Sequence, residues 1–197
     1  MKYLLLLSIL FLTACQTMGG IRDDFDILLV PDETKPAAKP SITAASACPP
    51  VRIMDDLKMS IEFTDMSAPS AATEMGRLSM SDLKVNCEVA GDEMIVEMDI
   101  GFDGKLGPKA RWKENDQASF AYPYFVAVTS PDGTVMSKEV FAASVSYGAK
   151  ENDIRQVETI HQTMPIRSGD DVSRYAIVLG FQLSDEQLAY NRETKKP

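Results

Sequence analysis

The stretch LKVNCEVAGDEMIVEMDIGF, residues 83–102, decides the fold of this chain. On both sides of Gly91-Asp92, apolar residues alternate with polar ones, which is typical of strands that turn one face toward a core. A Gly-Asp pair between two such runs favours a tight turn. The stretch therefore predicts a β-hairpin.

Outward from this hairpin, the same alternation predicts more strands. A second hairpin is expected where residues 122–128, rich in aromatic and β-branched side chains, lead through Ser130-Pro131-Asp132-Gly133 into residues 134–141. Further strands are predicted near residues 59–63, over 154–166 and over 175–183, about seven in all. Because no segment shows a sustained helical period, we expect a mainly β fold, an antiparallel two-sheet sandwich of immunoglobulin-like type. An open barrel is the alternative.

The C-terminal part of the chain carries a signal for the start of a helix. Ser184-Asp185-Glu186-Gln187 fits a capping box, in which the side chains of Ser184 and Gln187 each bond the free backbone N–H of the other. We expect a short helical turn over residues 185–191 that closes the sandwich.

The N-terminal part carries a targeting signal. An apolar run that begins at Tyr3, after Lys2, ends in Leu12-Thr13-Ala14-Cys15. This layout is typical of a secretory signal peptide, and the run is shorter than the roughly 20 apolar residues that cross a bilayer. The last four residues resemble the lipobox of bacterial lipoproteins, in which the cysteine receives a diacylglyceryl group and the chain is cut just before it. An ordinary signal peptide with a chance cysteine is the alternative.

The resemblance to lipoproteins implies an anchor and a location. Residues 1–14 are then the signal peptide, and acyl chains such as palmitate on Cys15 hold the protein on a membrane. In Gram-negative lipoproteins, an aspartate directly after the lipidated cysteine commonly retains the protein in the inner membrane. This chain has Gln16 at that position, so we expect an outer-membrane lipoprotein whose domain faces the periplasm.

Residues 15–47 are expected to form the lipidated N-terminus and a flexible tether, ahead of a β-sandwich domain over residues 48–197. Residues 32–47 are rich in Pro, Ala, Lys, Ser and Thr and offer few apolar side chains for a core. The patch from Phe25 to Val30 is mostly apolar, unlike a linker. Its residues Phe25, Leu28 and Leu29 are candidate contacts, either in an extra edge strand on the chain's own domain or in a segment that binds a partner's sheet or groove.

The cysteine count fits an oxidising compartment. The chain has three cysteines, and if Cys15 carries lipid, Cys48 and Cys87 remain to form a disulfide. On the chain-entropy model, such a bridge contributes about 4 kcal/mol to stability. Two separate buried thiols are the alternative.

Charge and composition exclude several functions. The formal net charge of −9 argues against nucleic acid and anionic lipid surfaces as partners of the domain. The single histidine, His161, lies in a polar strand, and we expect it to face solvent rather than to take part in catalysis. One histidine and three cysteines are too few for a zinc site once a lipid and a disulfide are assigned. We expect no enzyme activity, no metal and no cofactor.

One basic segment stands out in this acidic chain. Lys105, Lys109, Arg111 and Lys113 surround Trp112, the only tryptophan. Arginine and aromatic residues dominate binding hot spots, so Arg111 and Trp112 are candidate contacts for an anionic envelope component or an acidic protein patch. In the alternative, Trp112 packs on its own sandwich and the lysines are solvated.

A further resemblance concerns residues 122–128 with Pro131-Asp132-Gly133, and residues 180–183 with 186–192. These segments resemble uncharacterised Gram-negative envelope lipoproteins, a family without assigned activity. We therefore expect a non-enzymatic accessory or adaptor subunit of an envelope assembly, with an envelope protein as partner. A binding module for a glycan or lipid headgroup is the alternative, and a hydrolase is a third hypothesis.

Overall fold

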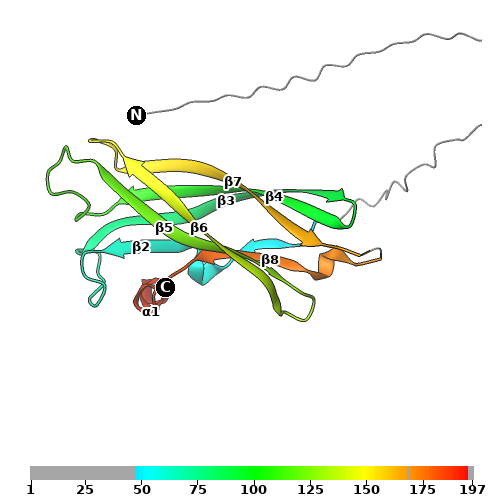
Figure 1. Ribbon diagram of the computed structural model, residues 1–197. Helices are drawn as coiled ribbons and strands as arrows, with labels where there is room; N and C mark the ends of the chain where they lie inside the picture. The colour runs from blue at the N-terminus through cyan, green and yellow to red at the C-terminus, as the bar shows by residue number, and fades with distance from the viewer. Residues whose placement is uncertain (1–47, 168, 195–197) are drawn as a thin grey trace, which may run out of the picture. The chain divides into compact units, whose positions relative to one another are not determined.

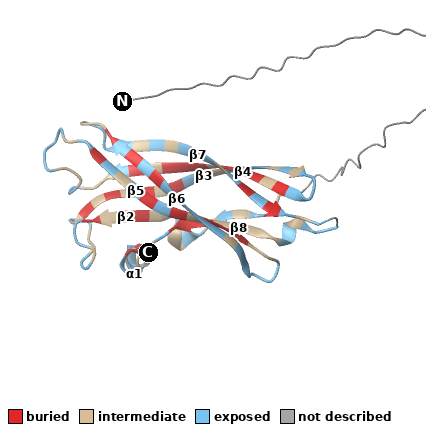
Figure 2. Ribbon diagram, in the orientation of Figure 1, coloured by how far each residue is buried: buried red, intermediate tan, exposed pale blue. Residues whose placement is uncertain are grey.

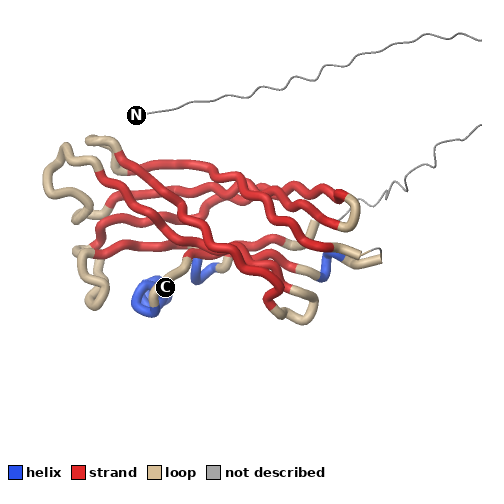
Figure 3. The backbone as a smooth tube through the Cα atoms, in the orientation of Figure 1, coloured by secondary structure: helices blue, strands red, loops and turns tan. Residues whose placement is uncertain are grey.

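Eight strands form two four-stranded sheets in residues 48–167 and 169–194, the residues that the computed structural model describes (Figure 1). Sheet I contains, in spatial order, β1 (Val51–Ile53), β8 (Ala176–Phe181), β5 (Ala118–Thr129) and β6 (Val135–Tyr147). Sheet II contains β2 (Met59–Phe63), β3 (Glu74–Ala90), β4 (Glu93–Leu106) and β7 (Asp153–Pro165). Two short 3-10 helices, η1 (Asp55–Leu57) and η2 (Val172–Arg174), and the C-terminal helix α1 (Asp185–Thr194) complete the regular structure (Figure 3). The predicted two-sheet β-sandwich is confirmed.

The hairpin predicted from residues 83–102 is the pair β3–β4. Its strands pair in antiparallel register up to Ala90 opposite Glu93, and Gly91 adopts a positive φ of 72° in the turn. β3 also extends further toward its N-terminus than the alternation indicates. The first part of the strand was not predicted because the register shifts between Met80 and Leu83. This bulge moves the inward-facing positions from even to odd residue numbers, so a single period does not run through the whole strand.

The other predicted strands are also present. The second predicted hairpin is β5–β6, with Gly133 at a φ of 86° in its turn. An eighth strand, β1, was not predicted, because three residues after Pro49-Pro50 are too few to show a period. β1 pairs with β8 in parallel, whereas all other strand pairs are antiparallel.

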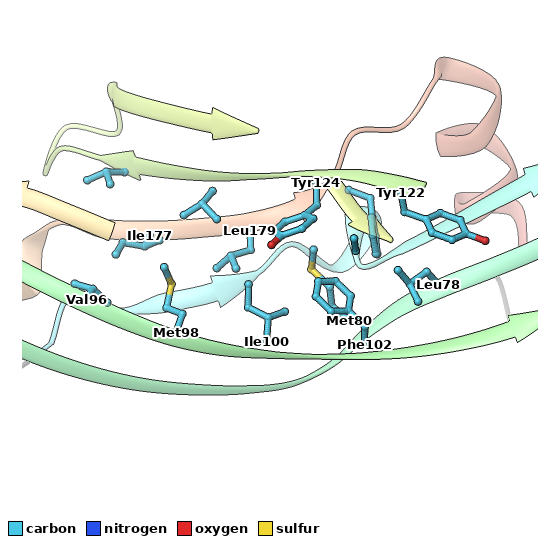
Figure 4. Close-up of a cluster of buried hydrophobic side chains, with 14 of the residues drawn as sticks. Leu78, Met80, Val96, Met98, Ile100, Phe102, Tyr122, Tyr124, Ile177 and Leu179 are labelled. Carbon is cyan, nitrogen blue, oxygen red and sulfur yellow. The ribbon is translucent and has the colours of Figure 1, made fainter. Parts of the chain in front are cut away.

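The core lies between the two sheets (Figures 2 and 4). Sheet II contributes alternating residues of β4, and sheet I contributes alternating residues of β5 and β8, all of them without solvent exposure or nearly so. These core residues are Met94, Val96, Met98, Ile100, Phe102, Tyr122, Tyr124, Val126, Val128, Ile177, Leu179 and Phe181. Met94 and Met98 thus fill space in the core, a role suited to their flexible side chains.

Helix α1 begins with the predicted capping box and is longer than the predicted turn. The backbone N–H of Gln187 donates to Oγ of Ser184 at 3.2 Å, and the N–H of Ser184 donates to Oε1 of Gln187 at 2.9 Å. The same helix covers the edge of sheet II. The side-chain amides of Gln187 and Asn191, both buried, donate to the carbonyl oxygens of Ile61 and Met59 in β2, at 2.8 and 2.7 Å.

The predicted disulfide is confirmed. Cys48 and Cys87 are bonded across a sequence separation of 39 residues, with their Cα atoms 5.8 Å apart. The bridge attaches the first described residue of the chain to β3 in sheet II, while β1, which follows directly, belongs to sheet I. The first described residues are therefore attached to both sheets.

Candidate binding loop at Trp112

Residues 107–117 join β4 to β5 and cross from sheet II to sheet I. In this loop, which we call the Trp112 loop, the indole of Trp112 is 100% exposed. The loop projects from one end of the sandwich, at the left of Figure 1. The alternative in which Trp112 packs on its own sandwich is therefore wrong.

Arg111 fixes the loop that presents Trp112. Its Nη1 donates to Oδ1 of Asn152 at 2.8 Å, and its Nη2 donates to the carbonyl oxygens of Gly148 and Glu151, both at 2.6 Å. All three acceptors belong to residues 148–152, the connection between β6 and β7. A planar guanidinium suits this fan of acceptors better than an ammonium group does. Arg111 therefore holds two loops together, while its neighbour Trp112 points to solvent.

The start of the Trp112 loop is held against β3. The backbone N–H groups of Gly107 and Lys109 donate to the carbonyl oxygens of Met75 and Glu74, each at 2.9 Å. A Cβ atom on Gly107 would lie 2.4 Å from the carbonyl oxygen of Glu74. Only glycine permits this close approach, so the sequence favours a fixed path for the loop.

A shallow hollow of about 590 Å³ lies beside the indole. It is lined by Lys105, Leu106, Gly107, Pro108, Ala110, Arg111, Trp112, Lys113, Glu114, Asn152 and Asp153. A second hollow of about 560 Å³ shares Lys105 and Asp153 with it and extends along β3, β4 and β7. The lining mixes lysine and arginine with carboxylates. This surface can therefore offer both hydrogen-bond donors and acceptors beside one large apolar side chain.

Tyr122 and Tyr124 of β5, which could have formed an aromatic-lined ligand site with Trp112, do not lie at the surface. Tyr122 and Tyr124 have no solvent exposure and belong to the core. Trp112 therefore has no tyrosine of β5 beside it at the surface. The geometry matches a protruding contact residue better than an aromatic-lined pocket.

His161 lies on the outer face of sheet II, where it faces solvent as predicted. Its Nε2 is 3.0 Å from Oε2 of Glu97 on the neighbouring strand, and both side chains are about half exposed. A catalytic triad also needs a nucleophile bonded to the imidazole. Within the described part of the chain, the ring of His161 bonds to no hydroxyl group.

No group of three or more His, Cys, Asp or Glu side chains is placed to hold a metal ion in residues 48–167 and 169–194. No helix of this part of the chain is both long and apolar enough to cross a membrane. Cys15, Phe25, Leu28 and Leu29 lie outside the described residues.

Sequence reasoning identified Trp112 and Arg111 but not the function of Arg111 in holding the loop. The acceptors of Arg111 lie 37 to 41 residues away in the chain, and no local pattern indicates such a contact.

Comparisons with protein-family models, with curated proteins and with solved structures found no match to this chain.

Proposed function

We propose that this protein is a non-enzymatic lipoprotein of the outer membrane, anchored through Cys15, whose sandwich serves as an adaptor in an envelope assembly. The Trp112 loop is its contact with a protein partner. The observation that carries this proposal is a fully exposed tryptophan on a loop that Arg111 fixes in place.

The energetics favour such a contact. A tryptophan side chain buries roughly 150–250 Å² at an interface, which corresponds to about 4–6 kcal/mol of apolar transfer free energy. Because hydrogen bonds already order the loop, binding loses little further conformational entropy. Burial of the exposed indole by a partner would therefore make Trp112 a hot spot of the interface.

The charges around the loop indicate the kind of partner surface. Lys109 and Lys113 lie in the loop and Lys105 lies near the end of β4, in a chain whose formal net charge is −9. A local cluster of cations on an acidic protein favours a partner that presents carboxylates around an apolar pocket. The partner proposed here is therefore an acidic protein surface of the envelope.

The test compares Trp112→Ala with Val157→Ala, a control on β7 whose side chain is also exposed, at 61%. Partner recovery is measured by crosslinked pull-down from envelopes, and folding by thermal melting. We expect Trp112→Ala to lose the partner with an unchanged melting temperature, and Val157→Ala to keep both. Recovery of the same partner with Trp112→Ala would contradict the proposal.

Trp112 also provides a direct optical readout. Because it is the only tryptophan of the chain and fully exposed, its fluorescence reports on this loop alone. Binding of the purified partner should shift its emission to shorter wavelength as the indole leaves water. An unchanged spectrum in a complex that forms would place the contact elsewhere.

A second candidate function is binding of a small anionic envelope ligand, and the hollow beside Trp112 favours it. Lys105 and Lys113 line this hollow and could bond a phosphate or carboxylate. Titration with soluble headgroup or peptidoglycan fragments, followed by Trp112 fluorescence, distinguishes the two candidates. Saturable quenching by a fragment, lost in a Lys105→Ala, Lys113→Ala variant, would favour the ligand.

A further inference from the structure

A pair of like charges interrupts the charge pattern on the outer face of sheet II. Among the described residues, facing charges on neighbouring strands of this sheet are otherwise of opposite sign, as in Lys84 and Asp99. Arg77 of β3, in contrast, lies directly opposite Lys105 of β4. Like charges in facing positions of an antiparallel pair are destabilising. A function in binding, rather than in stability, would account for this pair.

Arg77 is held in place along one edge of its guanidinium. Its Nε donates to Oε1 of Glu74 at 2.6 Å, and its Nη2 bonds Oε2 of the same carboxylate, which is almost completely buried. Nη1 has no hydrogen-bond partner among the described residues. Because Glu74 already orders the side chain, little further conformational entropy is lost when Nη1 binds a ligand. Arg77 is therefore a preorganised donor.

Arg155 of β7 is placed in the same way. Its Nη2 bonds Oδ2 of Asp82, and its Nε lies 3.6 Å from Oδ1 of Asp103. Within the part of the chain that the structure describes, Nη1 of Arg155 also has no partner. Two arginines on different strands are thus each held by carboxylates and each keep N–H groups for a ligand.

These side chains line one hollow of about 560 Å³ over β3, β4 and β7, which we call the Arg77 hollow. Lys105, exposed and without an ion pair to any described residue, lies between the two arginines in the lining. The hydroxyl group of Ser79 is a further donor in the lining, and the carboxylates are those of Asp103 and Asp153. The hollow therefore brings three positive charges and a hydroxyl group to one place on an acidic protein.

The arrangement of donors suits a phosphoryl group. A phosphomonoester carries nearly two negative charges at neutral pH and offers three strong acceptor oxygens. Guanidinium groups bind such oxygens through paired, charge-assisted hydrogen bonds. A carboxylate ligand would bring a single charge and two oxygens to the same three cations.

The carboxylates of the hollow indicate what carries the phosphate. Asp103 already pairs with Arg155, at 3.6 Å. Asp153 faces Lys105 across β4 and β7 but forms no ion pair within 4 Å with a described residue. Its oxygens can accept hydrogen bonds from hydroxyl groups next to the phosphate, as on a sugar or polyol.

We propose that the Arg77 hollow binds the phosphomonoester of a sugar or polyol. The phosphate contacts Arg77, Lys105 and Arg155, and a hydroxyl group of the ligand donates to Asp153. Because the net charge of −9 opposes an extended anionic surface, the site suits a single phosphoryl group. The proposal rests on the second candidate function, binding of a small anionic ligand, and places the phosphate here rather than at Lys113. Trp112 takes no part in it.

Titration calorimetry with glucose 1-phosphate tests the site, with glucose as the uncharged comparison. The Cys15→Ser protein is used, so that no lipid is attached. We expect saturable binding of glucose 1-phosphate and none of glucose. Lys105→Gln should weaken the affinity at least about tenfold, because a hydrogen bond to a charged group is lost. Arg77→Lys, which keeps the charge but not the fork, should weaken it as well.

A matched control separates a specific site from the overall charge. Lys84→Gln removes the same charge from another exposed position on the outer face of sheet II and should leave the affinity unchanged. Trp112→Ala should also leave it unchanged. Thermal melting checks that each variant keeps its fold, which we expect for Lys105→Gln because its side chain is exposed.

Flotation with phosphatidylcholine vesicles distinguishes two sources of the phosphomonoester. If vesicles that contain phosphatidic acid bind the Cys15→Ser protein and Lys105→Gln abolishes this binding, the phosphate belongs to a lipid headgroup. If glucose 1-phosphate binds and these vesicles do not, the ligand is a soluble sugar phosphate.

Three results would overturn the proposal. One is no saturable binding of glucose 1-phosphate and no binding to phosphatidic acid. Another is an equal loss for Lys84→Gln and Lys105→Gln, which would mean a general charge effect. The third is a loss that Lys113→Gln produces and Arg77→Lys does not. This last result would leave the second candidate function intact, with its ligand beside Trp112.

Discussion

At the scale of single residues, three buried tyrosines differ in what their hydroxyl groups contact. Tyr124 donates to Oε2 of Glu158 across the sandwich, at 2.8 Å. The hydroxyl groups of Tyr122 and Tyr147 are buried and have no hydrogen-bond partner among the described residues. Burial, together with the nearby carboxylate of Asp153, raises the pKa of Tyr147 to about 12. An unpartnered hydroxyl costs stability, whereas one bonded to a carboxylate contributes to it.

This difference predicts opposite results for the same substitution. Tyr147→Phe should leave the free energy of unfolding unchanged or raise it by up to about 1 kcal/mol, because it removes an unpartnered group. Tyr124→Phe should lower it by about 1.5–3 kcal/mol, because it removes a hydrogen bond to a carboxylate. Urea denaturation of the two variants provides the comparison. Equal losses for both would mean that Tyr147 has a partner in solution.

Glu62 is a second residue whose burial affects the stability of the fold. Burial raises the pKa of Glu62 above its ordinary value of 4.5, and a hydrogen bond with Gln187 partly opposes the shift. The folded state therefore favours the protonated form. The stability that this form contributes is complete below the unfolded pKa and is lost as the pH rises through the folded pKa.

We accordingly expect Glu62→Gln, which is always neutral, to raise the melting temperature at neutral pH. The gain should shrink toward zero as the pH falls below 4.5, where Glu62 itself is protonated in both states. Glu193→Gln, at an exposed position of α1, is the control and should show no such trend. Melting curves measured from neutral pH to below pH 4.5 make the comparison. A gain in melting temperature that is constant with pH would contradict the interpretation.

At the scale of elements, the spacing of two side chains on α1 matches the spacing of two carbonyl groups on β2, although a helix and a strand differ in rise per residue. Residues four apart in a helix rise about 6 Å, and residues two apart in a strand rise about 6.8 Å. Gln187 and Asn191 can therefore reach the carbonyl oxygens of Ile61 and Met59 at the same time. The oxygen of the Gln187 side chain also completes the capping box. One residue thus both starts the helix and docks it.

Removing these amides should loosen the edge of sheet II. Gln187→Ala and Asn191→Ala should each lower the free energy of unfolding by about 1–3 kcal/mol, because a strand carbonyl is left without its partner. Glu193→Ala, on the exposed side of the same helix, should change it by less than about 0.5 kcal/mol. Urea denaturation measures all three variants. If the control costs as much as the amide variants, helix propensity rather than docking explains the losses.

Elements with a regular period were predictable from the sequence, and those whose formation depends on distant contacts were not. The alternation in residues 83–102 predicted β3–β4, and a local box predicted the start of α1. The bulge after Met80 concealed the first half of β3, and β1 forms only because β8 lies beside it. At the candidate site, composition indicated Trp112, but its exposure depends on Arg111 and its acceptors in residues 148–152.

At the scale of the described domain, the outer faces of the two sheets differ. The outer face of sheet II carries facing pairs such as Lys84 with Asp99 and Glu97 with His161, which is typical of a solvated face. The strands of sheet I carry only Arg52 and Lys138 as charged residues on their outer face. The outer face of sheet I is therefore much poorer in charge than the outer face of sheet II.

The proposed anchor gives a prediction at the same scale. Cys15→Ser should abolish lipid labelling and release the protein from the membrane fraction, because this thiol is the proposed attachment site. Gln16→Asp should move the protein toward the inner membrane. Metabolic labelling with palmitate and a sucrose gradient measure the two effects. A Cys15→Ser chain that still sediments with membranes would contradict lipid anchoring, and an unchanged gradient for Gln16→Asp would remove the basis for the outer-membrane assignment.

The Cys48–Cys87 bridge also determines how mechanical load enters the domain. A pull on the chain ahead of Cys48 passes through the sulfur atoms into β3 at Cys87, which pairs with Val96 of β4. Without the bridge, the same force would reach β1 first, a three-residue strand that could peel away from β8. With it, tension enters the long ladder of backbone hydrogen bonds between β3 and β4. A pull from the N-terminal side can thus load the domain without first detaching β1.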